Sequence, residues 1–187
     1  MTIALIVLGV LAAWLIFTFN GLIALRNQVQ NAFRQIDVQL KRRHDLIPNL
    51  VNSVKGEMKF EQDTLEKVIA ARGAAVSASA GGKMSEISKK EGELSSALGR
   101  LFALSENYPN LKSSDAVRTL MEELSSTENK IAFSRQFYND LVTGFNTKQQ
   151  VFPTNMISAM LGFTAAELFE LPENSAEREN PKVDLSV

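Results

Sequence analysis

Residues 2–25 read TIALIVLGVLAAWLIFTFNGLIAL and contain no charged side chain. As a helix that rises about 1.5 Å per residue, this stretch is long enough to cross a hydrocarbon core of about 30 Å with some tilt. A cleaved signal peptide would begin with basic residues and would turn polar soon after its small residues, whereas here the apolar run continues well past Ala12 and Ala13. The pattern therefore predicts an uncleaved transmembrane anchor over residues 1–25, with membrane lipid as its partner.

Basic side chains follow the predicted span, and none precedes it. They are Arg26, Arg34, Lys41, Arg42 and Arg43. The flank of a membrane span that carries the Lys and Arg residues usually lies in the cytoplasm. We therefore expect a single-pass protein with its N-terminus outside and the following domain in the cytoplasm.

The composition excludes several classes of function. The chain has no cysteine, which removes disulfides, thiol catalysis and thiolate metal sites. Twenty Lys and Arg residues stand against 21 Asp and Glu residues, for a net charge of -1. A domain with this balance offers no electrostatic footprint for nucleic acid, so we expect no nucleic-acid partner.

Helical periodicity follows the anchor, and sustained β-branched alternation is not seen, so the predicted fold class is all-α. The first soluble helix is predicted over residues 26–80. Pro48 lies inside it and leaves the carbonyl of His44 without its intrahelical donor, which predicts a very long, kinked helix. Its seam positions step by three and four residues: Val29, Phe33, Ile36, Leu40, Arg43, Ile47, Leu50, Val54, Glu57, Glu61, Leu65, Val68 and Arg72.

Two further long helices are predicted. Gly81 and Gly82 end the first helix, and Ser85 is a candidate N-cap for the second, whose apolar stripe runs to Leu104. A third helix is predicted from Ser114 or Asp115 to Phe152, with coiled-coil-like spacing. Its stripe is Val117, Leu120, Leu124, Ile131, Tyr138, Leu141, Phe145 and Phe152. The sequence thus predicts an antiparallel helical bundle over residues 26–171.

The end of the chain is less regular. A short apolar helix is predicted from Met156 to Leu161. Thr164 and Glu167 have the spacing of a capping box, with Phe163 and Leu168 as its hydrophobic staple, which predicts another helix start. Residues 172–187 hold few large apolar groups and many charges, which is typical of a flexible acidic tail.

Three strings are more distinctive than bundle packing requires. They are DVQLKRRHDLIPNL at 37–50, ENYPNLK at 106–112, and a third group formed by Glu128-Asn129, RQFYN at 135–139, Asn146 and FPTN at 152–155. Together, and with an anchor in front of them, they resemble the LemA family. This resemblance implies an antiparallel helical bundle attached to the bacterial inner membrane, and it covers the chain from about Leu25 to Phe169.

The resemblance implies a role without fixing an activity. Members of the family are connected with membrane shaping, with envelope stress and with membrane metalloproteases. The leading hypothesis is a scaffold that forms homo-oligomers through its helices and its anchor. The alternative is an adaptor or regulator of a membrane metalloprotease or another membrane protein, with the loop Asn107, Tyr108, Pro109 and Asn110 or the tail as the contact.

Candidate polar residues share one stripe of the third helix. Glu128, Arg135, Asn139 and Asn146 are spaced by seven, four and seven residues. Their expected partners on the first helix are Asp37, Lys41 and Asp45. Such a stripe is either an interface or, as we favour, a polar network that fixes the register of the bundle. The run Lys41, Arg42 and Arg43 points in three directions and is interpreted as solvated.

No catalytic, cofactor-binding or metal site is predicted, and the protein is not expected to be an enzyme. His44 is the only histidine, and Asp45 follows it directly. Neighbouring helical residues face about 100° apart, so the two cannot act together on one substrate. There is also no second imidazole or thiolate to complete a metal site.

Overall fold

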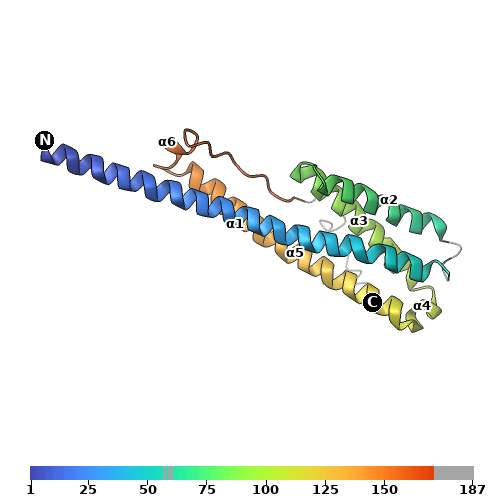
Figure 1. Cartoon of the computed structure of the whole chain (residues 1–187). Coiled ribbons are helices and arrows are strands. Elements are labelled where there is room, and N and C mark those ends of the chain that lie inside the picture. The colour runs from blue at the N-terminus through green and yellow to red at the C-terminus, as the bar shows by residue number, and fades with distance from the viewer. Residues whose placement is uncertain (57, 59–60, 171–187) are drawn as a thin grey trace, which may run out of the picture. The chain divides into compact units, whose positions relative to one another are not determined.

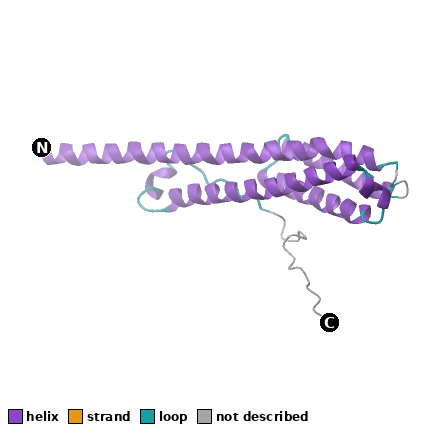
Figure 2. Cartoon of the chain, turned by 90° about the horizontal axis from the view of Figure 1, so that it is seen from below, coloured by secondary structure: helices purple, strands orange, loops and turns teal. Residues whose placement is uncertain are grey.

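The computed structural model describes residues 1–56, 58 and 61–170. This part of the chain forms six α-helices and no strand, so the all-α prediction is confirmed (Figure 2). The helices are α1 (Thr2–Val54), α2 (Gln62–Ser79), α3 (Met84–Ser105), α4 (Pro109–Ser113), α5 (Asp115–Gln150) and α6 (Asn155–Ser158). Among the described helices, α1 alone is long and apolar enough to cross a membrane.

The chain divides into two compact units. Of the described residues, unit 1 comprises 1–38 and 132–168, and unit 2 comprises those between 39 and 131 together with Phe169 and Glu170. The two long helices, α1 and α5, contribute residues to both units.

Unit 1 is built from the first part of α1, the last part of α5 and the segment that follows α5, which contains α6 (Figure 1). The ring centroids of Phe33 and Tyr138 lie 6.1 Å apart. Phe163 packs against Phe19 at 5.9 Å and against Phe145 at 6.3 Å. Later residues of α5 thus meet earlier residues of α1, as the predicted antiparallel arrangement requires.

Unit 2 encloses a hydrophobic core to which α1, α2, α3, α4 and α5 all contribute side chains. The end of α1 packs with the α2–α3 hairpin and the first turns of α5 (Figure 1). Its buried members include Ile47, Leu50, Val51, Val54, Leu65, Val68, Leu94, Leu98, Leu101, Val117 and Leu124. Apart from Val51, these are positions that helical spacing assigned to the seams, so this part of the pattern is confirmed.

The prediction of one helix to residue 80 is wrong. α1 ends at Val54, Lys55 and Gly56 form a turn, and α2 begins at Gln62. The apolar spacing continues across this break because both helices face the same core, so periodicity alone does not reveal the interruption. Glu57, which we placed in the seam, lies outside the described residues.

The two-glycine stop after α2 is present, with Gly81 and Gly82 two and three residues after the last helical residue, Ser79. Gly82 donates its N–H to the carbonyl of Ala78 at 2.7 Å. A Cβ at this position would lie 2.6 Å from that oxygen, so the turn needs glycine.

The capping-box prediction at Thr164 is also wrong. Residues 163–170 have no regular secondary structure, so no helix begins at this place. Side chains of α5 hold this segment instead: Tyr138 donates its hydroxyl to the carbonyl of Glu167 at 2.8 Å. α6 is shorter than predicted, and the tail at 172–187 lies outside the described residues.

Candidate functional site

A buried ionic cluster is the main polar feature of unit 2, and Arg43 is its centre. Only 1 % of Arg43 is exposed. Its guanidinium pairs with the carboxylates of Glu91 on α3 and Glu128 on α5. It also donates to Ser95 Oγ at 2.8 Å, and that hydroxyl donates in turn to Glu128 at 2.8 Å. One side chain of α1 therefore connects two other helices.

His44 completes the cluster. Its Nε2 lies 2.8 Å from Oε1 of Glu91, and an ionised carboxylate only accepts, so Nε2 carries the hydrogen. Burial by itself raises the pKa of a carboxyl group. Here the hydrogen bond from His44 and the charge of Arg43 outweigh burial and hold the pKa of Glu91 below its ordinary value. Glu91 is therefore ionised at neutral pH.

The sequence interpretation of the charge run is wrong for Arg43 and holds for its neighbours. Lys41 and Arg42 are exposed, and Arg42 pairs with Glu123 at 3.5 Å across a solvated surface. Arg43 occupies a seam position, as its spacing from Leu40 and Ile47 already indicated. The missed partner was Glu91, which lies between Ile87 and Leu94 on the apolar stripe of α3.

Pro48 is accommodated by a side chain from another helix. α1 continues through this proline, which has no N–H to donate to the carbonyl of His44. Arg72 on α2 supplies the missing donor, because its Nε lies 2.6 Å from that carbonyl oxygen. Two consecutive residues of α1, Arg43 and His44, are thus tied to the rest of unit 2 through side chain and backbone.

The cluster is suited to holding helices in register. Its charges are balanced by direct contacts, and it lies within the helix packing, where Arg43 and Glu91 are almost fully buried. Within the described residues, no group of three or more His, Cys, Asp or Glu side chains is placed to hold a metal ion. The chemistry of the cluster is that of a buried salt bridge, whose charged groups come from α1, α3 and α5.

The predicted stripe of α5 is divided between the two units, with Glu128 in unit 2 and the other three residues in unit 1. Asp37, Lys41 and Asp45 are exposed on α1, and their pairing with the stripe stays a prediction. Glu128 joins Arg43 in unit 2. Arg135 and Asn139 lie half-buried in unit 1, and each interacts with another group.

Asn146 binds backbone instead of a charged side chain. Its Nδ2 donates to the carbonyl of Ala166, and its Oδ1 accepts from the N–H of Ala166, both at 2.9 Å. This amide pair, with Tyr138 bound to Glu167, fixes the end of unit 1 to α5. Burial and the charge of Glu167 raise the pKa of Tyr138, so the hydroxyl keeps its proton and can donate.

The loop proposed as a partner contact is partly packed inward. Pro109 is the first residue of α4, and Tyr108 is half-buried against the core of unit 2. The hydroxyl of Tyr108 donates to Glu61 at 3.5 Å. Asn107, Pro109 and Asn110 are exposed. Tyr108 therefore helps to hold the loop on the bundle.

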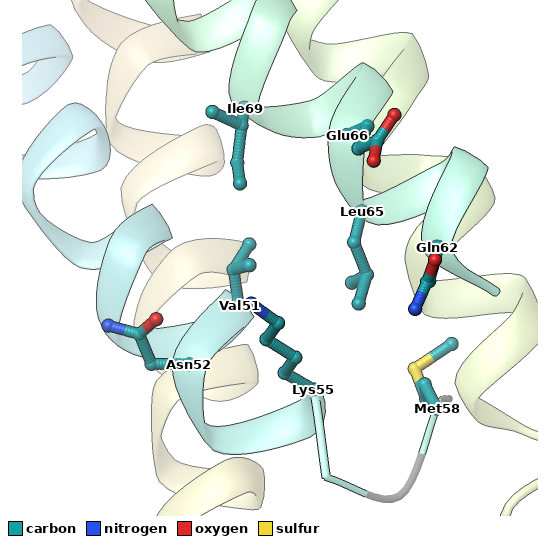
Figure 3. A pocket seen from close by; sticks show the side chains of 8 residues that line it. All are labelled: Val51, Asn52, Lys55, Met58, Gln62, Leu65, Glu66 and Ile69. Carbon is teal, nitrogen blue, oxygen red and sulfur yellow. The ribbon is translucent and has the colours of Figure 1, made fainter. Parts of the chain in front are cut away.

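A cavity of about 500 Å³ lies in unit 2 between the end of α1 and the start of α2. Figure 3 shows the side chains that surround it, which come from the end of α1, the first turns of α2 and, for Lys55 and Met58, the connection between these helices. The lining mixes apolar groups with Lys55, Glu66 and two amides: Val51, Asn52, Lys55, Met58, Gln62, Leu65, Glu66 and Ile69. The ionic cluster around Arg43 does not contribute to it.

Comparison with known proteins places these features in a family. The chain is 30% identical to Protein LemA of Metamycoplasma hominis over 89% of this chain and 74% of that protein. It is 27% identical to magnetosome protein MamQ 2 of Paramagnetospirillum magneticum, over 89% of this chain and 72% of the relative. It is 24% identical to magnetosome protein MamQ of Magnetospirillum gryphiswaldense, over 90% and 71%. The model of the LemA family matches residues 32–185, and the chain belongs to the LemA family.

Proposed function

We propose that this protein is a non-catalytic, membrane-anchored scaffold that assembles with copies of itself. The support for the anchor is the exposure of α1 within unit 1. Residues 2–17 carry no charge, and every one of them is exposed except the half-buried Trp14. An exposed apolar helix of this length is unfavourable in water, whereas a bilayer surrounds it with matching apolar groups.

The anchor and the packed part of unit 1 belong to one helix. α1 has no break between the exposed apolar turns and Leu22 and Val29, which are buried in unit 1. Because the helix is continuous, its buried part follows the axis of the membrane span. The span therefore sets the orientation of unit 1 relative to the bilayer. Copies held in one membrane therefore present the same surface at the same height.

The observation that carries self-assembly is an exposed aromatic pair on α5. Phe133 is 73% exposed and Phe137 is 50% exposed, one helical turn apart in unit 1. Single exposed apolar residues are ordinary, but two adjacent large rings form a patch of the kind that marks an interaction surface. A second copy fits this patch, because a symmetric pair buries the same rings on both sides.

Disulfide crosslinking in membranes tests this proposal, since the chain has no cysteine of its own. With Phe133→Cys, oxidation should give a dimer of the full-length protein on a non-reducing gel. Thr143→Cys is the matched control, exposed in the same unit on a face about 100° away, and should stay monomeric. Equal crosslinking at both positions, or none at either, would contradict assembly through this patch. An adduct with a different protein would support an adaptor instead.

The orientation is part of the same proposal. The basic residues after the span support a cytoplasmic location for the bundle at the bacterial inner membrane, with the N-terminus outside. In intact cells, an impermeant maleimide should label Thr2→Cys. It should label Ser96→Cys, which is exposed on α3, only after permeabilisation. The reverse pattern would overturn the orientation and leave the anchor intact.

A further inference from the structure

We infer that residues 151–161 form a second membrane contact, inserted in the interface of the bilayer beside the point where α1 leaves it. This inference rests on the proposed anchoring of α1. The segment follows α5, contains α6 and belongs to unit 1 together with the apolar part of α1. Its partner is the lipid surface, at the level of the headgroups and the first acyl carbons.

The depth of the segment follows from its contacts with α1. Phe163, two residues after the segment, stacks edge-to-face on Phe19 at 5.9 Å, and the Arg26 guanidinium lies 5.7 Å from the centroid of the same ring. Arg26 is the first charge after the apolar run, so the boundary of the hydrocarbon lies close before it. Phe163 therefore lies at the depth of the boundary between the acyl chains and the headgroups.

The length of the span supports this depth independently. A hydrocarbon core of about 30 Å holds about 20 helical residues, and counting that number back from Leu25 includes Phe19. The exposed residues 2–17 alone would cover only about 24 Å. The bilayer must then also surround the helical turn of α1 that contains Thr18 and Leu22. Both side chains are buried by other residues of unit 1. The part of unit 1 that packs against α1 at this depth of the bilayer must therefore contact lipid.

Large apolar side chains of the segment are exposed, while two of its polar side chains are buried. Phe152 is 79% exposed, Met156 67% and Met160 85%. The polar side chains of Thr154 and Ser158 are buried instead. Asn155 is the exposed polar side chain of the segment, and its other exposed side chains are apolar, which matches the amphipathic character of interfacial membrane segments.

The absence of charged side chains in and around the segment also supports a membrane contact. Every residue from Gln149 to Ala166 is uncharged, between Lys148 on one side and Glu167 on the other. Charged side chains are costly near hydrocarbon, so a run without them is tolerated there. We predicted Phe152 to belong to the buried stripe of α5, and its exposure now has a physical reason in lipid contact.

Several backbone N–H and C=O groups of the segment are hydrogen-bonded to each other, as contact with hydrocarbon requires. An unpaired N–H or C=O is expensive near hydrocarbon, so a membrane contact needs internal hydrogen bonds. The N–H groups of Asn155 and Ser158 bond to the carbonyls of Val151 and Thr154 at 3.0 and 2.9 Å. Those of Leu161 and Phe163 bond to Ile157 and Ser158 at 2.9 and 3.0 Å.

Gly162 lets the chain turn back. Its φ of 76° is in the left-handed region, which glycine adopts without strain. The segment can therefore enter the interface and return to α5 within a few residues.

The test is depth-dependent fluorescence quenching in the full-length, cysteine-free chain. Single cysteines at Phe152 and Met160 carry an environment-sensitive NBD label, and the protein is placed in phosphatidylcholine–phosphatidylglycerol vesicles. Lipids with a nitroxide near the headgroup or deep in the acyl chain then act as quenchers. Leu8→Cys in the span is the positive control, and the exposed Asp140→Cys of unit 1 is the aqueous control.

We expect labels at 152 and 160 to emit at shorter wavelength than the label at 140, and to lose more emission to shallow nitroxides than to deep ones. The label at Leu8 should be quenched by deep nitroxides. A second variant adds Met156→Asp and Met160→Asp to the label at 152. Both positions are exposed, so the fold should persist by circular dichroism while the quenching at 152 is lost.

The outcomes separate the two proposals. Quenching at Leu8 without quenching at 152 and 160 would overturn the second contact and leave the anchor standing. A blue-shifted emission at 152 and 160 that nitroxides do not quench would also overturn it, because protein would then cover the segment. Absence of quenching at all labelled positions, Leu8 included, would refute the anchor and the contact that depends on it.

Discussion

Replacing Glu91 with alanine should destabilise unit 2 strongly, because it leaves Arg43 and His44 without their shared buried acceptor. Arg43 keeps its hydrogen bond to Ser95 and one carboxylate partner, Glu128, whose side chain is 39% exposed. Removing one member of a buried ion pair typically costs about 3 to 5 kcal/mol, a large part of a stability of about 5 to 15 kcal/mol. For a chain of this size, that corresponds to a fall in Tm of about 6 to 20 °C.

The assay is thermal unfolding of the full-length protein in detergent, followed by circular dichroism. Glu123→Ala is the matched control, since Glu123 forms a solvated pair with Arg42 at 3.5 Å and exposed pairs contribute about 0 to 1 kcal/mol. If Glu91→Ala and Glu123→Ala melted at the same temperature, the cluster would not be the tie between helices that its contacts indicate.

The pH dependence gives a second check on the same residue. The folded-state pKa of Glu91 lies below its unfolded value, so its contribution is present above about pH 4.3 and is lost as the pH falls through the folded pKa. Wild-type stability should therefore fall more steeply than that of Glu91→Ala on acidification below that pH. Parallel curves for the two proteins would contradict the lowered pKa.

Three further predictions concern the other ties in the fold. Arg72→Met should cost about 1 to 3 kcal/mol in thermal unfolding, because it orphans the carbonyl that the proline of α1 leaves without a donor, and unchanged melting would show that water replaces it. Asn146→Ala should release the segment after α6, seen as faster proteolysis at Glu167 with α5 intact, whereas unaltered cleavage would mean that packing alone holds it. Deletion of residues 1–17 should leave the helical content of the remainder intact. Deletion of residues 1–25 should cost a further 2 to 5 kcal/mol or so, since it removes the buried Leu22, and equal melting of the two would show that Leu22 adds nothing.

Several parts of the fold could be predicted because they depend on local chemistry. The anchor needs only an uninterrupted apolar run, and the core positions of α1, α3 and α5 follow from spacing by three and four residues. The break after Val54 was not predictable in the same way. Two helices that face one core keep a single apolar rhythm, so only the packed structure shows that the chain turns there.

The candidate site shows the same division more sharply. The sequence by itself determined that Arg43 holds a seam position on α1 and that Pro48 leaves a carbonyl without a donor. Only the tertiary structure decided that Glu91 pairs with Arg43 and that Arg72 donates to the free carbonyl. Glu91 and Arg72 are remote in sequence, and the α2–α3 hairpin places them beside α1. The same holds for Phe152, whose apolar character is local but whose exposure depends on what packs beside α1. Spacing states which face a residue occupies, and long-range packing decides whether that face meets protein, water or lipid.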